Sequence, residues 1–231
     1  MISFIITSVN EDYEYLNETF AQIDKVCNDY EIVFASDREY TNDWVGNVNY
    51  IHTDLETSVK NYNEGIRQSK GDIVLVTADD HFILEDPTPI FKSKKSPLVG
   101  CRGFVQLDVD QSLPAPGGGP GPPWPKCDTP WLYPWVNYLV APFPMFNRGV
   151  LEVTDGVIFN ESFKHHWVDH WLGYFFTMKY GTSVTMDPGS FLKQREKEAT
   201  NSSHDDHDMS IMRKLTDHFQ KDPEMSYNTS V

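Results

Sequence analysis

Basic residues, cysteines and long apolar segments are all scarce in this sequence, and each shortage excludes a class of protein. The 231 residues include 34 acidic but only 19 basic ones, which gives a net charge of −15. A chain this acidic repels nucleic acid and anionic membranes over most of its surface, so its charge does not support nucleic acid as a partner. No apolar segment is long enough to span a bilayer, and no transmembrane segment is expected.

The few cysteines argue against both disulfides and structural zinc. Three cysteines are an odd number, and they form no Cys-x-x-Cys pair: Cys27, Cys101 and Cys127. The first residues, MISFIITSVNE, carry no basic leader and no small-residue cleavage pattern, so no signal peptide is expected. These absences together predict a cytoplasmic protein in a reducing environment.

The first half of the chain alternates apolar strands with amphipathic helices. Strands are expected at 2–8, 31–36, 48–53 and 72–77. Helices are expected after Asn10 and across 57–69. The strands are continuous apolar runs, which is typical of strands covered on both faces. This order predicts an α/β fold with a mainly parallel central sheet flanked by helices.

The second half has a different composition. Residues 114–125 contain only proline and glycine apart from Ala115 and Trp124, which predicts an extended loop rather than a helix or an inner strand. A helix is expected from about 167 to Gly181, and a last helix is expected to begin near Ser203.

One buried strand leads directly into two carboxylates and an imidazole, in the stretch GDIVLVTADDHFI. Ligands of open α/β sheets bind beyond the carboxyl ends of the strands, where Asp79 and Asp80 are expected to lie. Adjacent carboxylates repel each other unless a cation lies beside them, and oxygen ligands suit Mg²⁺ or Mn²⁺. His81 favours Mn²⁺ slightly. The alternative is a surface turn that uses aspartate as a turn residue.

Four segments resemble, in order and spacing, the family 2-like glycosyltransferases of the GT-A fold. They are ISFIITSVNE, EIVFASD, NEGIRQSKGDIVLVTADDHF and GVIFNESF…VDHW. The first two match the family's first-strand turn and the strand that ends in an aspartate. The third matches the helix and strand leading to the DxD-type metal motif, and the fourth matches the later segment with the catalytic aspartate. The likeness covers about residues 1–90 and 140–180, and it implies a GT-A, Rossmann-like domain.

The resemblance places the nucleotide-sugar donor at the ends of the first strands. Ser8 and Asn10 match the turn that holds the nucleobase and ribose, and Asp37 matches the carboxylate that reads the base. Lys60 lies on the helix that faces the phosphates. Asn63 fits the family's Asn-x-Gly position on the same helix.

The resemblance also implies the metal ligands and the general base. Asp79 and Asp80 match the last two acidic positions of the metal motif, while Thr77 stands where its first aspartate usually is. Asp169 matches the family's catalytic aspartate, and Val168 replaces the glutamate before it.

Histidines and aromatic residues near these positions complete the candidate site. His81 and His204 are candidate metal ligands. For both His204 and His207 the choice between a metal ligand and a solvated helix start is open. Four further residues are candidates for the acceptor side, because aromatic faces suit sugar rings, although core packing would explain them equally well: Trp124, His166, Trp167 and His170.

The implied reaction moves a sugar from a nucleotide-sugar donor, with UDP favoured, to an acceptor hydroxyl with inversion. Asp169 is the expected general base, and Mn²⁺ or Mg²⁺ is the expected cofactor. Such hexosyl- or pentosyltransferases act in glycan biosynthesis. A single domain is expected over 1–221, with a donor half (1–97) and an acceptor half (98–221) that includes the loop 114–125. Residues 222–231 are expected to be a frayed tail.

Two other functions stay open. A sugar nucleotidyltransferase would have a similar sheet, but such enzymes usually open on a glycine-rich phosphate loop that this sequence does not show. A catalytically weak or inactive nucleotide-sugar or carbohydrate-binding module would fit the departures at Thr77 and Val168. The sequence leaves the donor sugar, the acceptor and the oligomeric state open.

Overall fold

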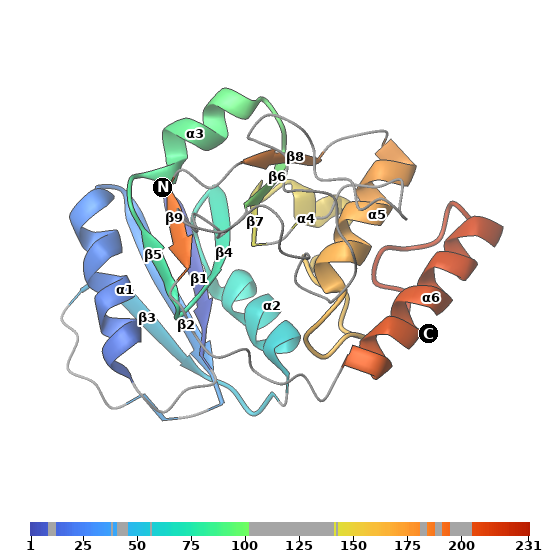
Figure 1. Ribbon diagram of the computed structural model, residues 1–231, viewed down its shortest axis with the longest axis horizontal. Helices are drawn as coiled ribbons and strands as arrows, with labels where there is room; N and C mark the ends of the chain where they lie inside the picture. Colours follow the sequence, from blue (N-terminus) through green and yellow to red (C-terminus); the bar gives the residue numbers. More distant parts are fainter. Residues whose placement is uncertain are drawn as a thin grey trace, which may run out of the picture.

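The computed structural model of the protein describes residues 1–8, 13–37, 39–40, 46–55, 57–101, 141, 143–180, 184–187, 191–194 and 205–231. In this part of the chain a seven-stranded sheet has helices on both faces, and a two-stranded sheet lies beside it (Figure 1). The predicted loop 114–125 and three of the predicted site residues lie outside the described residues: Asn10, Trp124 and His204.

The large sheet has the strand order β3-β2-β1-β4-β7-β6-β8. Its strands are β1 (Ile2–Thr7), β2 (Tyr30–Ser36), β3 (Val48–His52), β4 (Ile73–Ala78), β6 (Leu98–Cys101), β7 (Pro144–Asn147) and β8 (Val184–Asp187). Neighbouring strands are parallel except that β7 runs antiparallel to both β4 and β6. The smaller sheet pairs β5 (His81–Ile83) with β9 (Leu192–Gln194). The mainly parallel central sheet predicted from the sequence is therefore confirmed.

The helices cover the two faces of the large sheet. They are α1 (Tyr13–Val26), α2 (Ser58–Gln68), α3 (Pro87–Lys94), α4 (Val150–Val153), α5 (Val168–Tyr180) and α6 (Asp205–Lys221). Apolar residues of α1 and α3 belong to one core cluster, and those of α2, α5 and α6 belong to the other. Figure 1 shows the same division, with α1 on one side of the strands and α2, α5 and α6 on the other.

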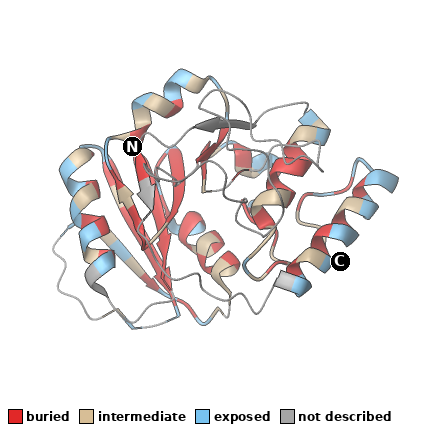
Figure 2. Cartoon of the chain, in the orientation of Figure 1, coloured by how far each residue is buried: buried red, intermediate tan, exposed pale blue. Residues whose placement is uncertain are grey.

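The central strands are mostly apolar because both of their faces are buried. In β1, Phe4 and Ile6 face the α1 side, whereas Ile5 faces the α2 side. Figure 2 shows these strands as buried over most of their length. Helix α2 lies so close to β1 that a Cβ atom at Gly65 would be 2.7 Å from Ile5 Cγ2. Since β-branched side chains are stiff, only glycine fits there without displacement.

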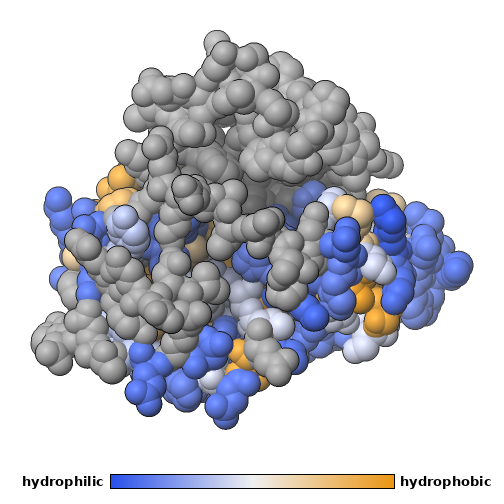
Figure 3. Space-filling model, turned by 60° about the horizontal axis from the view of Figure 1, so that its bottom comes forward, coloured by the Kyte–Doolittle hydropathy of each residue, from blue (hydrophilic) through white to orange (hydrophobic). Residues whose placement is uncertain are grey.

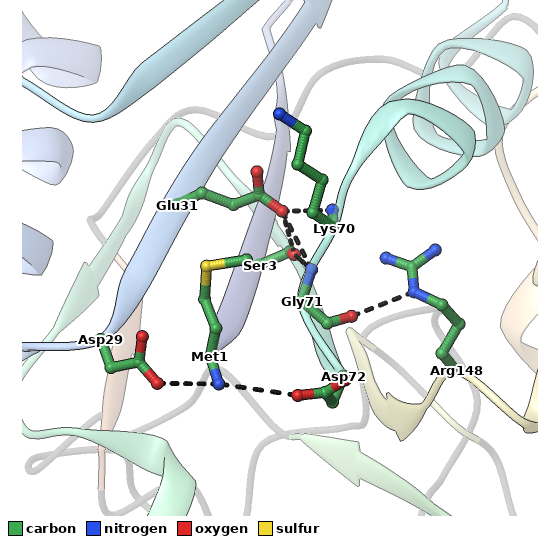
Figure 4. A network of polar contacts seen from close by, with 8 residues as sticks. All are labelled: Met1, Ser3, Asp29, Glu31, Lys70, Gly71, Asp72 and Arg148. Carbon is green, nitrogen blue, oxygen red and sulfur yellow. Dashed lines mark hydrogen bonds and ion pairs between the residues drawn. The ribbon is translucent and has the colours of Figure 1, made fainter.

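A polar network fixes the starts of the central strands at the edge opposite the candidate site (Figure 4). Ser3 Oγ donates to Glu31 Oε1 at 2.6 Å, and the Gly71 N–H donates to Ser3 Oγ at 2.8 Å. The amine of Met1 lies 2.8 Å from Asp29 Oδ2. These contacts join β1, β2 and the residues before β4, so they help to set the register of the three strands.

Hydrogen bonds also fix both ends of α2. Thr57 is its N-cap and accepts from the Lys60 N–H at 3.3 Å. At the other end Arg148 donates to Ile66 O at 3.3 Å and to Ser69 Oγ at 2.7 Å. A cation is favourable at a helix carboxyl terminus, where carbonyl groups lack partners within the helix. The position of α2 matters because it carries Lys60 and Asn63 toward the candidate site.

The described surface is mostly polar on the face shown in Figure 3, with apolar residues in small separate groups. None of the helices in the described part of the chain is both long and apolar enough to cross a membrane.

The carboxyl-terminal residues are packed into the fold, and the expectation of a frayed tail was wrong. Tyr227 is buried, and its hydroxyl donates to Ile158 O at 2.6 Å. Its carbonyl accepts from Asn160 Nδ2 at 2.9 Å and from Trp171 Nε1 at 3.2 Å. A few isolated apolar residues in a polar stretch carry no periodic pattern, so this packing was not predictable from the sequence.

Replacing Tyr227 by phenylalanine tests the packing of this segment. The ring would stay, but the buried carbonyl of Ile158 would lose its donor, which costs about 1–3 kcal/mol. We expect the free energy of unfolding, measured by urea titration, to fall by that amount. Tyr180→Phe, at an exposed position, is the matched control and should change it by less than about 0.5 kcal/mol. Equal stability of the two variants would contradict the packing described.

Candidate functional site

The parallel pairing of β1 and β4 brings two predicted site residues together. Ile6 is opposite Thr77 and Thr7 is opposite Ala78, so the next residue of each strand leaves the sheet at the same point. Ser8 Oγ donates to Asp79 Oδ2 at 2.6 Å, although the two residues are 71 positions apart in the chain. The predicted donor turn and the predicted metal motif therefore meet at the carboxyl edge of the sheet.

Asp79 and Asp80 form a buried acidic turn at this edge. Their exposed fractions are only 6% and 8%. Thr19 of α1 holds the turn, because its hydroxyl lies 3.0 Å from the carbonyl oxygens of both Asp79 and His81. Removing two neighbouring carboxylates from water is costly unless donors or positive charge compensate for it. The donor Ser8 supplies part of this compensation to Asp79.

The acidic turn fits a divalent cation that shares its ligands with a phosphate. Within the described ranges, no group of three or more His, Cys, Asp or Glu side chains is arranged to hold a metal. Mg²⁺ is commonly bound by one or two carboxylates, with the remaining ligands supplied by substrate phosphates and water. Asp79 and Asp80 are the residues that would hold such an ion.

His81 lies beneath the acidic turn rather than at its surface. The ring is wholly buried and meets Phe143 edge-on at 4.2 Å between centroids. Its Nδ1 accepts from the Ala78 N–H at 3.3 Å and lies 2.8 Å from Thr77 Oγ1. Only Nε2, 3.8 Å from Asp80 Oδ1, is directed to the carboxylates. Because Nδ1 accepts a hydrogen bond, the neutral ring carries its hydrogen on Nε2 and in this state does not offer that atom to a metal. Metal binding by His81 stays a prediction.

The structure adds Tyr62 of α2 to the candidate site. Its hydroxyl donates to the carbonyl of Thr77, next to the acidic turn. Burial raises the pKa of this hydroxyl, a hydrogen bond with Thr7 lowers it, and the charges of Asp79 and Asp80 raise it further. Tyr62 therefore remains a neutral donor below the carboxylates. Nothing in the sequence distinguishes it from a packing residue.

The other predicted donor residues lie around the same edge. Asp37 is exposed directly after β2, and Lys60 is half-buried in the first turn of α2. Asn63 is buried, and its amide nitrogen donates to Phe159 O at 2.7 Å and to Glu161 Oε1 at 3.2 Å. These bonds give Asn63 a structural role, since they tie α2 to the segment that leads to α5. Donor contacts by these residues stay predictions.

Asp169 lies in the first turn of α5 and is half-buried. Its Oδ1 accepts from the His170 N–H at 2.9 Å, and its carbonyl accepts from the Ala141 N–H at 3.2 Å. The rings of Trp167 and His170 are 4.6 Å apart. Burial lowers the pKa of His170, and the Asp169 charge offsets part of that effect. The predicted base and two predicted acceptor-side residues are therefore neighbours.

Asp208 is a second residue that the sequence did not indicate. It is wholly buried at the start of α6 and accepts from the successive N–H groups of residues 164, 165 and 166. His207 Nδ1 also lies 2.8 Å from its Oδ1. Burial disfavours the charged form, but these hydrogen bonds outweigh burial, so the pKa of Asp208 is below its usual range. The sequence indicated the histidines of SSHDDHD, whereas among its described residues, 206–208, the buried one is this aspartate.

The two remaining candidate histidines, His166 and His207, differ in their surroundings. The side chain of His207 is 42% exposed apart from its contact with Asp208. His166 Nε2 is buried and makes no hydrogen bond with any residue the structure describes. The ring of His166 packs edge-on against His165 at 4.4 Å. Its predicted place on the acceptor side stays a prediction.

Comparison of the sequence with protein-family models and with curated proteins finds no match. Comparison of the fold with solved structures finds TarS 1–349 of S. aureus at 16% identity and a TM-score of 0.57, covering 84% of this chain and 60% of that one. The same protein in complex with UDP-GlcNAc has 15% identity, a TM-score of 0.63 and coverages of 98% and 68%.

A second similar structure is the mannosyltransferase PcManGT from Pyrobaculum calidifontis in complex with GDP-Man and Mn²⁺. Its identity is 15%, its TM-score is 0.56, and the match covers 97% of this chain and 64% of that one. Identities this low show the fold alone, and the expected GT-A-like fold is confirmed. The chain spans about two thirds or less of the length of these relatives.

The lowered pKa of His170 predicts how stability depends on pH. The folded chain resists protonating this ring, while the unfolded chain binds the proton below about pH 6.5. Its contribution to stability is therefore present above that pH and is lost as the pH falls toward the folded pKa. Urea titrations at pH 8.0, 6.5 and 5.5 should show the wild type losing more stability than His170→Gln. Parallel losses would contradict the lowered pKa.

Proposed function

We propose that the protein is a metal-dependent, inverting glycosyltransferase that uses a nucleotide-sugar donor. The observation that carries the proposal is the Ser8–Asp79 hydrogen bond beside Asp80. It joins, at the carboxyl edge of the sheet, the two segments that we propose bind the donor. The fold is shared with TarS, solved with UDP-GlcNAc, and with a mannosyltransferase solved with GDP-Man and Mn²⁺. These relatives support a nucleotide-sugar donor, and we favour UDP as its nucleotide.

In the proposed reaction the donor lies across the carboxyl ends of β1, β2 and β4. In this proposal Asp37, which is exposed after β2, reads the base, and Lys60, in the first turn of α2, faces the phosphates. A cation held by Asp79 and Asp80, Mn²⁺ or Mg²⁺, would neutralise the diphosphate as it leaves. Ser8 orients Asp79 through its hydrogen bond.

Asp169 is proposed to remove the proton from the acceptor hydroxyl. Its carboxylate is half-buried and has one oxygen hydrogen-bonded to the His170 N–H, which leaves the other oxygen to accept the proton. Attack from the face opposite the leaving diphosphate inverts the anomeric carbon. The neighbouring rings of Trp167 and His170 offer an apolar surface on which a sugar acceptor could pack.

A binding module without turnover is the second candidate, and one observation favours it. Thr77 replaces the first aspartate of the metal motif, and its hydroxyl contacts His81 Nδ1 at 2.8 Å. It is wholly buried and therefore cannot replace the missing carboxylate contact with the donor. Release of nucleoside diphosphate from a sugar nucleotide would distinguish an enzyme from a binding module. Release of pyrophosphate from a nucleoside triphosphate and a sugar 1-phosphate would instead indicate a nucleotidyltransferase.

Asp80→Asn should abolish metal-dependent donor binding. With UDP-GlcNAc or another UDP-sugar at a hundredfold excess over Kd and Mn²⁺ present, linkage should stabilise the wild type by about 2.7 kcal/mol. That corresponds to a rise in Tm of roughly 5–10 °C, and EDTA should remove it. The variant should show no rise, while the exposed control Glu85→Gln should keep it. An equal rise in Asp80→Asn would contradict the proposed metal site.

Asp169→Asn should separate binding from turnover. Loss of the base should lower kcat for donor hydrolysis or transfer by about 10²–10⁴-fold. The affinity for UDP with Mn²⁺, measured by calorimetry, should stay within about twofold of the wild type, because the base does not contact the nucleotide. Glu152→Gln, an exposed position on α4, is the control. Unchanged kcat in Asp169→Asn would assign the base to another residue.

A further inference from the structure

One buried carboxylate joins the last helix to the segment that leads to the proposed base. Asp208 is completely buried in the first turn of α6. Its Oδ1 accepts from the Lys164 N–H at 2.9 Å, and its Oδ2 accepts from the N–H groups of His165 at 2.8 Å and His166 at 2.7 Å. Three successive N–H groups held by one carboxylate fix the path of the backbone there.

Only Trp167 separates the segment held in this way from α5. Trp167 has φ +60°, in the left-handed region that a non-glycine residue adopts at a cost of about 1–3 kcal/mol. Such a conformation persists only where contacts on both sides enforce it. Asp208 provides the contacts before Trp167, and the bond from the Trp171 N–H to Trp167 O, at 2.9 Å, provides the contact after it.

A second contact ties the same segment to the helix on the donor side. Ser58, at the start of α2, has its Oγ 2.7 Å from His165 Nδ1 and 3.3 Å from Lys164 O. Lys60 lies two residues further along this helix. Residues 164–166 therefore connect three helices: α6 through Asp208, α2 through Ser58, and α5 through the chain itself.

We propose that Asp208 is a positioning residue that holds residues 164–166 and thereby orients Asp169 for proton removal. The inference rests on the proposed function, which it extends to a residue outside the candidate site. The charge state matters chemically. Three N–H donors and His207 require an acceptor with lone pairs on both oxygens, which a carboxylate provides. In asparagine one oxygen becomes an NH₂ group, so it would face at least one N–H donor without accepting its hydrogen.

Asp208→Asn is the test, with Asp206→Asn as its matched control on the same helix at an exposed position. We expect kcat for UDP-sugar hydrolysis with Mn²⁺ to fall about 10–100-fold, since small displacements of a reacting group have effects of this size. The Kd for UDP should stay within about twofold. Hydrogen exchange at the amides of residues 164–166 should become at least about tenfold faster. The control should change none of these quantities.

Several results would overturn the proposal. One is a folded Asp208→Asn with wild-type kcat, and another is a parallel loss of kcat, UDP affinity and Tm, which would indicate a structural role alone. If Asp208→Asn does not fold, His207→Gln and Ser58→Ala replace it, each expected to lower kcat by about 2–10-fold at unchanged UDP affinity. Unchanged kcat in both would then overturn it. A wild type that turns over no donor overturns the proposed function itself, whereas an active wild type matched by Asp208→Asn overturns only the positioning role.

Discussion

The register of the parallel pair β1–β4 is the constraint on which the candidate site depends. Ile6 is opposite Thr77, and this pairing brings Ser8 and Asp79 to the same edge, where they form a hydrogen bond. A slip by one residue would turn each strand's buried side chains to the opposite face, and both faces are packed with apolar residues. The network of Ser3, Glu31 and Gly71 at the other edge supports the same register (Figure 4).

This register creates a site whose local chemistry is unfavourable by itself. Two neighbouring carboxylates, Asp79 and Asp80, are almost completely buried. The protein compensates in part with the hydroxyl of Ser8 and with the contact from Thr19 that holds the turn. Two carboxylates at one turn make a divalent cation a suitable ligand, and the cation can in turn bind a diphosphate. This pairing of carboxylates is the physical basis of the proposed function.

The second half of the site depends on contacts between helices rather than on the sheet. Asp169 begins α5, and the segment before it is held by Asp208 of α6 and by Ser58 of α2. The carboxyl-terminal segment adds to this arrangement, because Tyr227 accepts from Trp171 of α5 and donates to Ile158. Residues far away in the chain therefore determine where the proposed base lies.

Local patterns in the sequence were enough to predict the strands 2–8, 31–36, 48–53 and 72–77, each within one residue of the observed bounds, and the helices that alternate with them. They also located the acidic turn, because a buried strand that runs into carboxylates is visible in one stretch of sequence. Only the tertiary structure identified Tyr62, Asp208 and the packing of Tyr227. Each of these acts through a contact with a distant segment, and such a contact has no local periodicity or motif from which it could be predicted.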